Sequence, residues 1–236
     1  THKPINMFTV NINTEDRGSS YEQFEKEFLN ICDQHHNDNR ALVFAFLLYD
    51  FENYQIAKIL DDAHYWISLN AISGDYLTVF SLHYKAEDMK KKIMEMMQRK
   101  MNQTTDKEFS MIATYGNPSL DTNKLIKKYF GNEINVKYPS VLFFQVQNSN
   151  VSDYRLIQLD QKEIEASFLE LKKYIEVAAK ALQEVNRENK NNVNEIFNLV
   201  DESVAGIRLG IQIKKGIKTV TSITELAATV VGLNPT

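Results

Sequence analysis

The most restrictive feature of the sequence is a nearly unbroken apolar run at residues 41–49, ALVFAFLLY. A strand that carries apolar side chains on both faces must be covered on both sides, as in the centre of a parallel sheet. A polar segment at 35–39 (HHNDN) precedes the run and is expected to form a solvated turn. A helical pattern follows it. The chain is therefore expected to fold as an α/β protein around this strand.

The spacing of apolar residues predicts strands and helices that alternate along the chain. Because strands joined by helical crossovers pair in parallel, the first three strands are expected to be parallel, and a later hairpin adds an antiparallel edge. No element is predicted between a charged helix at 85–101 and Pro118. The other predicted elements are strands at 7–12 and 76–84, helices from Ser19 to Cys32 and from Ile56 to Ile67, the latter ended by Gly74, a helix at 120–130, strands at 140–146 and 154–159 joined by a polar turn at 147–153, and a helix from Gln161 to Leu182.

Composition excludes several classes of function. The formal net charge is -4, which does not fit a nucleic-acid binder with a basic surface. Cys32 is the single cysteine, so this sequence contains neither an internal disulfide nor a cysteine-based zinc cluster. A reducing, cytoplasmic setting fits this cysteine count. The sequence shows no glycine-rich phosphate loop and no metal-ligand spacing, so we expect no cofactor and no metal. It also has no run of about 18 uncharged apolar residues, so we expect no membrane-spanning helix.

Two segments carry a resemblance to a known family. Ala41–His64 resembles the central strand and following helix of thioredoxins, and Tyr138-Pro139-Ser140 before VLFF resembles the cis-proline that enters a later core strand. The resemblance covers about residues 6–185, with an inserted Met-rich helix at about 85–118. It implies a thioredoxin-like, three-layer α/β/α domain with a mixed sheet over residues 1–185, and it leaves 186–236 as a helical C-terminal extension.

In this register the Cys-x-x-Cys motif of the family falls on Asp50, Phe51, Glu52 and Asn53. Thiol–disulfide exchange needs a thiolate at a helix N-terminus, and neither Asp50 nor Asn53 supplies one. Asp50 is interpreted as a helix N-cap, with a catalytic carboxylate as the alternative. Glu52 is expected in the first helical turn. Cys32 is interpreted as a small buried hydrophobe, against the alternative of a reactive thiol.

The family resemblance also implies a role for Tyr138, Pro139 and Ser140. A cis peptide before Pro139 would present a backbone edge to a bound partner chain. The alternative is a trans proline at the start of a strand, where its missing N–H does no harm. We expect the cis form.

Two further segments are candidate interaction surfaces. The inserted helix has a methionine stripe that includes Met94, Met97 and Met101 and that suits an adaptable binding surface, or packs on its own domain or on a second copy. Residues 203–233 place Ile207, Ile211 and Ile217 near helical spacing, and Gly206, Gly210 and Gly216 are expected to interrupt the helix. This locally basic region is either a peripheral membrane contact or a helical hairpin that packs on the domain or across a dimer.

These features lead to one main functional hypothesis and two alternatives. The main hypothesis is a non-catalytic protein-interaction or assembly module, built on a redox-inactive thioredoxin-like domain, whose partner is another protein or a second copy. The first alternative is a glutathione-transferase-like enzyme, a family that also joins a thioredoxin-like part to helices. The second is a membrane-associated effector that acts through its C-terminal helices.

Overall fold

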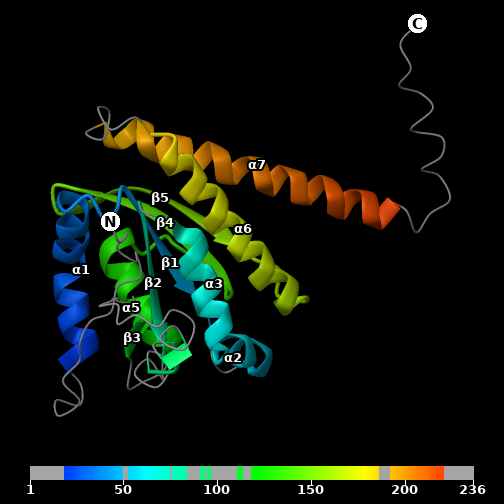
Figure 1. Cartoon of the computed structure of the whole chain (residues 1–236), viewed down its shortest axis with the longest axis horizontal. Coiled ribbons are helices and arrows are strands. Elements are labelled where there is room, and N and C mark those ends of the chain that lie inside the picture. Colours follow the sequence, from blue (N-terminus) through cyan, green and yellow to red (C-terminus); the bar gives the residue numbers. More distant parts are fainter. Residues whose placement is uncertain are drawn as a thin grey trace, which may run out of the picture.

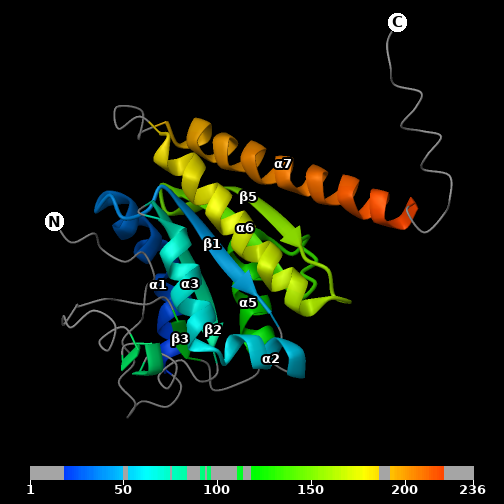
Figure 2. The ribbon, with the colours of Figure 1, turned by 45° about the vertical axis from the view of Figure 1, so that its right-hand side comes forward.

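The chain folds into a five-stranded mixed sheet with helices on both faces (Figures 1 and 2). The computed structural model describes residues 19–49, 53–74, 76–83, 91–93, 95–96, 111–113, 118–185 and 192–220. The predicted strand at 7–12 lies outside these residues. The elements are α1 Ser19–Asn37, β1 Val43–Leu48, α2 Tyr54–Leu60, α3 Ala63–Ser73, β2 Leu77–His83, β3 Met111–Ala113, α5 Pro118–Phe130, β4 Ser140–Gln147, β5 Asn150–Gln158, α6 Ile164–Gln183 and α7 Val193–Val220.

Strand β1 occupies the centre of the sheet, as its apolar composition predicts. The strand order is β3-β2-β1-β4-β5. Strand β1 pairs in parallel with β2 and antiparallel with β4, while β3 continues the parallel side and β5 the antiparallel side. All six residues of β1 are buried. The α/β class and the predicted antiparallel hairpin, formed by β4 and β5, are therefore confirmed.

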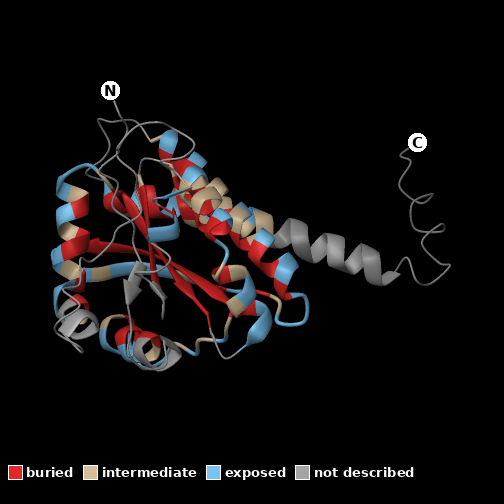
Figure 3. Ribbon diagram, turned by 60° about the horizontal axis from the view of Figure 1, so that its bottom comes forward, coloured by how far each residue is buried: buried red, intermediate tan, exposed pale blue. Residues whose placement is uncertain are grey.

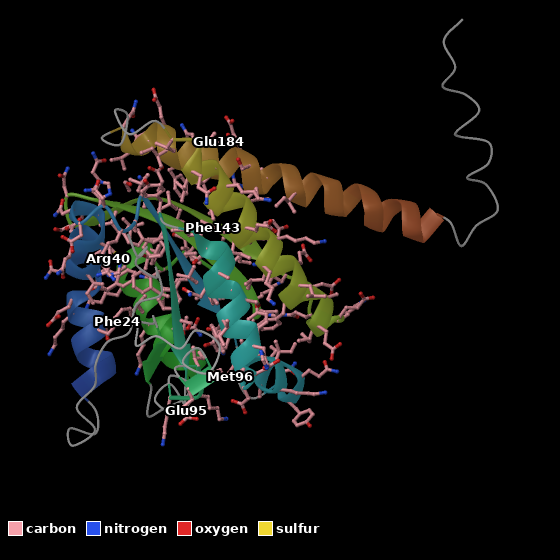
Figure 4. The ribbon with its side chains drawn as sticks, viewed as in Figure 1. Phe24, Arg40, Glu95, Met96, Phe143 and Glu184 are labelled. Carbon is pink, nitrogen blue, oxygen red and sulfur yellow. The ribbon has the colours of Figure 1, made fainter. Side chains whose placement is uncertain are left out.

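Alternate residues of β1 belong to two separate hydrophobic clusters. Val43, Ala45 and Leu47 pack into a cluster with α2, α3, α6 and the first turns of α7. The intervening residues Phe44, Phe46 and Leu48 pack into a cluster with α1 and α5. This alternation follows from the pleat of a strand, which sends successive side chains to opposite faces. The result is three layers, with buried residues along both faces of the sheet (Figure 3). Figure 4 labels one aromatic residue of each cluster, Phe143 of the first and Phe24 of the second.

The helix predicted over 56–67 is two helices, which corrects the sequence interpretation. Helix α2 ends with Asp61 as its C-cap, and α3 begins with Asp62 as its N-cap. The Asp62 carboxylate accepts a hydrogen bond from the backbone N–H of His64 at 2.9 Å. The indole N–H of Trp66 donates to the carbonyl of Leu60 at 2.7 Å, which satisfies a carbonyl at the end of α2. Gly74 ends α3 as predicted, with a φ of 71°.

The hairpin between β4 and β5 is tighter than predicted. Its turn consists of Asn148 and Ser149, which have φ values of 52° and 56°. Two consecutive residues with positive φ are typical of a type I′ turn, whose twist matches that of the flanking strands. Strand β5 starts at Asn150, so the polar residues assigned to a turn at 147–153 partly belong to the strand. They are polar because β5 is an edge strand with exposed side chains.

Strand β3 was not predicted. Met111–Ala113 pairs in parallel with Ser81–His83 of β2 at the other edge of the sheet. A strand of three residues is too short for a period-two pattern to be recognised in the sequence.

His35 is buried, which contradicts its assignment to a solvated turn. Helix α1 continues to Asn37, so His35 lies in its last turn, where it is only 2% exposed. Its Nδ1 is hydrogen-bonded to Thr78 Oγ1 of β2 at 3.0 Å. Burial lowers the pKa of His35 to about 4, and the nearby Arg40 acts in the same direction while Asp38 opposes it.

Helix α7 is continuous, so the expected interruption by Gly206, Gly210 and Gly216 is wrong. Glycine in a helix interior costs about 1 kcal/mol relative to alanine, which is too little to break a helix that packs elsewhere along its length. Figure 1 shows the start of α7 beside the end of α6, which it then crosses. None of the helices in the described ranges is both long and apolar enough to span a membrane. The buried residues of α7 are Val193, Ile196, Phe197, Val200 and Val204.

We predict that protonation of His35 destabilises the fold. Because the pKa in the folded chain is about 4, the unfolded chain, with a pKa near 6.5, takes up a proton first. The free energy of unfolding should therefore be constant above about pH 6.5, fall by about 3 kcal/mol down to about pH 4 on account of this residue, and level off below. Urea unfolding of wild type and His35→Asn across this range measures the difference. His36→Asn is the control and should keep the wild-type pH slope; an identical slope for His35→Asn contradicts the prediction.

Candidate binding site between helices α2, α3 and α6

Asn53 caps helix α2 at the place where the family resemblance positions the second cysteine. Its side-chain oxygen accepts hydrogen bonds from the backbone N–H groups of Gln55 at 3.0 Å and Ile56 at 3.4 Å. Asp50, Phe51 and Glu52 lie outside the described residues. The N-cap is therefore Asn53 and not Asp50, and because α2 begins at Tyr54, Glu52 is not in its first turn.

The peptide bond between Tyr138 and Pro139 is cis, as predicted. Pro139 is buried, and its carbonyl accepts a hydrogen bond from the N–H of Leu159 at 3.0 Å. The Tyr138 carbonyl accepts one from Gln161 Nε2 at 2.7 Å. The Ser140 hydroxyl donates to the carbonyl of Lys137. Both carbonyls at this edge thus accept a hydrogen bond from within the chain.

A groove of about 560 Å³ lies between α2, α3 and α6. Its aromatic floor is Tyr65 of α3 and Phe168 of α6, whose rings meet edge to face at 5.5 Å. The Tyr65 hydroxyl donates to the carbonyl of Phe168 at 3.3 Å, which ties α3 to α6 beneath the groove. The lining residues are Lys58, Ile59, Asp62, His64, Tyr65, Ser68, Glu165, Phe168, Leu169 and Lys172.

Lys172 is the most perturbed charged group in the groove. Its ammonium lies 4.7 Å from the centre of the Tyr65 ring, within the range of a cation–π interaction. Burial lowers the pKa of Lys172, and the negative charge of Asp62 acts against this shift. The structure gives Lys172 no ion pair with any described residue. A partly desolvated cation on an aromatic floor can accept an anionic group.

Two of the exposed large apolar side chains among the described residues belong to helices that line the groove. Leu169 is 62% exposed on the rim of the groove, and Tyr54 is 79% exposed in the first turn of α2. A smaller hollow of about 350 Å³ lies between Gln55 of α2 and the first residues of α6, and Glu165 lines both hollows. The groove and this hollow therefore adjoin each other at Glu165.

Cys32 lies on the opposite side of the sheet from the groove. It is fully buried in the cluster of α1 and α5, as its interpretation as a small hydrophobe predicts. Burial, with a smaller contribution from Asp33, raises the pKa of its thiol well above the ordinary value. A buried, protonated thiol is a poor nucleophile.

The other predicted interaction surfaces are described only in part. In the inserted segment, Ile93 is buried in the cluster of α2, α3, α6 and α7, and Met96 packs partly buried against it, while Glu95 is exposed (Figure 4). Ile207 packs against this cluster as well. Met94, Met97 and Met101, and the side chains of Ile211 and Ile217, lie outside the described residues. The stripe of the inserted segment therefore packs on its own domain at the two positions that the structure describes.

The sequence interpretation missed the groove because three separate elements supply its lining. Its one local signal is the set of Glu165, Phe168, Leu169 and Lys172, which recur at three- and four-residue spacing along α6. Among the described residues, no group of three or more His, Cys, Asp or Glu side chains is placed to hold a metal ion.

Comparisons of the chain with protein-family models, with curated proteins and with solved structures find no match.

We predict that Asn53 stabilises the start of α2. Asn53→Ala removes the oxygen that accepts two backbone N–H groups and should lower the free energy of unfolding by about 1 kcal/mol. Asn53→Asp keeps an accepting oxygen and should stay within a few tenths of a kcal/mol of wild type. Urea unfolding of the three proteins measures both values. Equal stability of Asn53→Ala and wild type would show that the cap contributes nothing.

Proposed function

We propose that the chain is a redox-inactive, thioredoxin-like protein-interaction module. The order of elements supports the thioredoxin-like assignment. Apart from the edge strand β3 between β2 and α5, a central strand is followed by helices α2 and α3, a parallel neighbour, the short helix α5, an antiparallel hairpin and helix α6. This is the order that the resemblance of Ala41–His64 and Tyr138–Ser140 implies.

The observation that carries the proposal is the use of Asn53 as a helix cap. In the register of the resemblance, this position holds a thiol that takes part in disulfide exchange. Asn53 instead uses its amide oxygen to bind two backbone N–H groups. The one thiol of the chain is buried in the other layer. These two facts leave no described group for thiol chemistry and favour binding without catalysis.

The groove between α2, α3 and α6 supports binding of another protein. It combines an aromatic floor, an exposed leucine and charged rim residues, which is the composition of a protein contact surface more than of an enclosed catalytic pocket. A protein partner in the cytoplasm fits the single buried cysteine, and a second copy of the chain is the alternative occupant.

Restoring the cysteines tests the thioredoxin-like register. In a Cys32→Ala background, the double variant Asp50→Cys/Asn53→Cys should form an intrachain disulfide and reduce insulin with dithiothreitol, because the N-terminus of α2 lowers the pKa of a thiol at residue 53. The wild-type chain should show no insulin reduction above the background rate. Asn53→Cys alone is the control and should form no intrachain disulfide. Failure of the double variant to form one would contradict the register, and reduction by the wild type would contradict the redox-inactive assignment.

Peptide display tests the interaction function. The immobilised full chain should enrich a consensus from a library of random peptides, because a module with a formed groove needs little reorganisation to bind. Binding of synthetic consensus peptides is then measured by fluorescence anisotropy. A scrambled peptide of the same composition is the control. A library that yields no sequence bound above this control would contradict the proposed function.

A further inference from the structure

Besides its aromatic floor, the groove has two aliphatic side chains in its lining. Leu169 is 62% exposed, and Ile59 is partly buried beside the aromatic floor. Single exposed leucines are ordinary on protein surfaces. Leu169, however, stands over a concave surface whose lysine side chains add their aliphatic stems to its apolar area. A ligand that covers Leu169 must therefore extend from the groove over its rim.

Three of the four acidic or lysine side chains in the groove are balanced by helix ends. Asp62 caps the N-terminus of α3, and Glu165 lies in the first turn of α6, where the helix dipole favours negative charge. Lys58 lies in the last turn of α2, where the dipole favours positive charge. None of these three charges requires an external partner.

Lys172 is the remaining charge. It lies in the middle of α6, far from both helix ends, and no described residue forms an ion pair with it. Its contacts are the Tyr65 ring at 4.7 Å and a longer-range attraction to Asp62, whose Oδ1 already accepts the His64 N–H. Since a partly desolvated ammonium gains from an anionic partner, the groove is complementary to a carboxylate at this position.

We propose that this groove binds a segment of another protein that sets an apolar side chain against Leu169 and Ile59 and an acidic side chain against Lys172. The inference rests on the proposed function and names its partner by chemistry. A segment of polypeptide fits better than a small molecule, because small-molecule sites bury most of the ligand surface. Here the apolar contact stands on an open rim, which an extended chain can cover while its acidic residue enters the groove.

The test measures the affinity of a display-selected peptide for variants of the full chain. Leu169→Asp and Lys172→Glu should each weaken binding about tenfold or more, because the first sets a charge against the apolar side chain of the peptide and the second sets like charges against each other. Lys173→Glu is the matched control, because Lys173 is an exposed neighbour on α6 that does not line the groove, and it should stay within about twofold. Circular dichroism checks that each variant is folded, and Lys172→Gln replaces Lys172→Glu if the latter is not.

Charge exchange separates recognition from structural damage. A peptide in which lysine replaces the acidic residue should bind Lys172→Glu at least about tenfold better than it binds the wild type. Peptides that bind the wild type and both groove variants equally would overturn this inference and leave the interaction function standing. Peptides without an acidic residue would overturn the role of Lys172. Self-association that Leu169→Asp abolishes would show a second copy in the groove and overturn the proposed partner.

Discussion

Strand β1 is buried along its whole length, and both hydrophobic cores depend on it. Its odd-numbered residues pack under α2, α3 and α6, and its even-numbered residues pack under α1 and α5. Each face of the strand can therefore be covered only if a complete layer of helices forms on that side. Its pairing with β2 on one edge and β4 on the other sets the order of the remaining strands. The groove lies in the helical layer on one face of this sheet, at the junction of α2 and α3 with α6.

The shape of the groove depends on the break between α2 and α3. Asp61 and Asp62 end one helix and start the next, and the Trp66 indole bonded to Leu60 holds the junction from below. The break lets Lys58 and Ile59 of α2 line the same hollow as the first residues of α3. A continuous helix would send these residues along one axis, with less of a concave surface between them. The hydrogen bond from Tyr65 to Phe168 then fixes α6 as the opposite wall.

The start of α2 and the cis-proline segment both have structural roles in the fold. Asn53 stabilises α2 as a cap, and the carbonyls of Tyr138 and Pro139 are bonded within the chain. Both features use their polar groups in hydrogen bonds within the chain. Among the described residues, the exposed large apolar side chains are Leu169 of α6, Tyr54 of α2 and Tyr154 of β5, and the first of these lines the groove. Binding energy at such a surface comes from desolvated contacts and needs no reactive group.

Local periodicity in the sequence determined the central strand, the buried faces of α1 and α6, the hairpin and the burial of Cys32, because side-chain spacing along one element reports which face is covered. Tertiary structure alone decided the rest. In the sequence, two consecutive aspartates are compatible with the exposed face of one continuous helix. Only the capping hydrogen bonds of Asp61 and Asp62 show that α2 ends and α3 begins there. His35 can be buried because it forms a hydrogen bond with Thr78, which is distant in sequence. Strand β3 forms because it pairs with the free edge of β2. The groove joins Lys58 and Lys172 through packing across the fold, a long-range relation that no local pattern records.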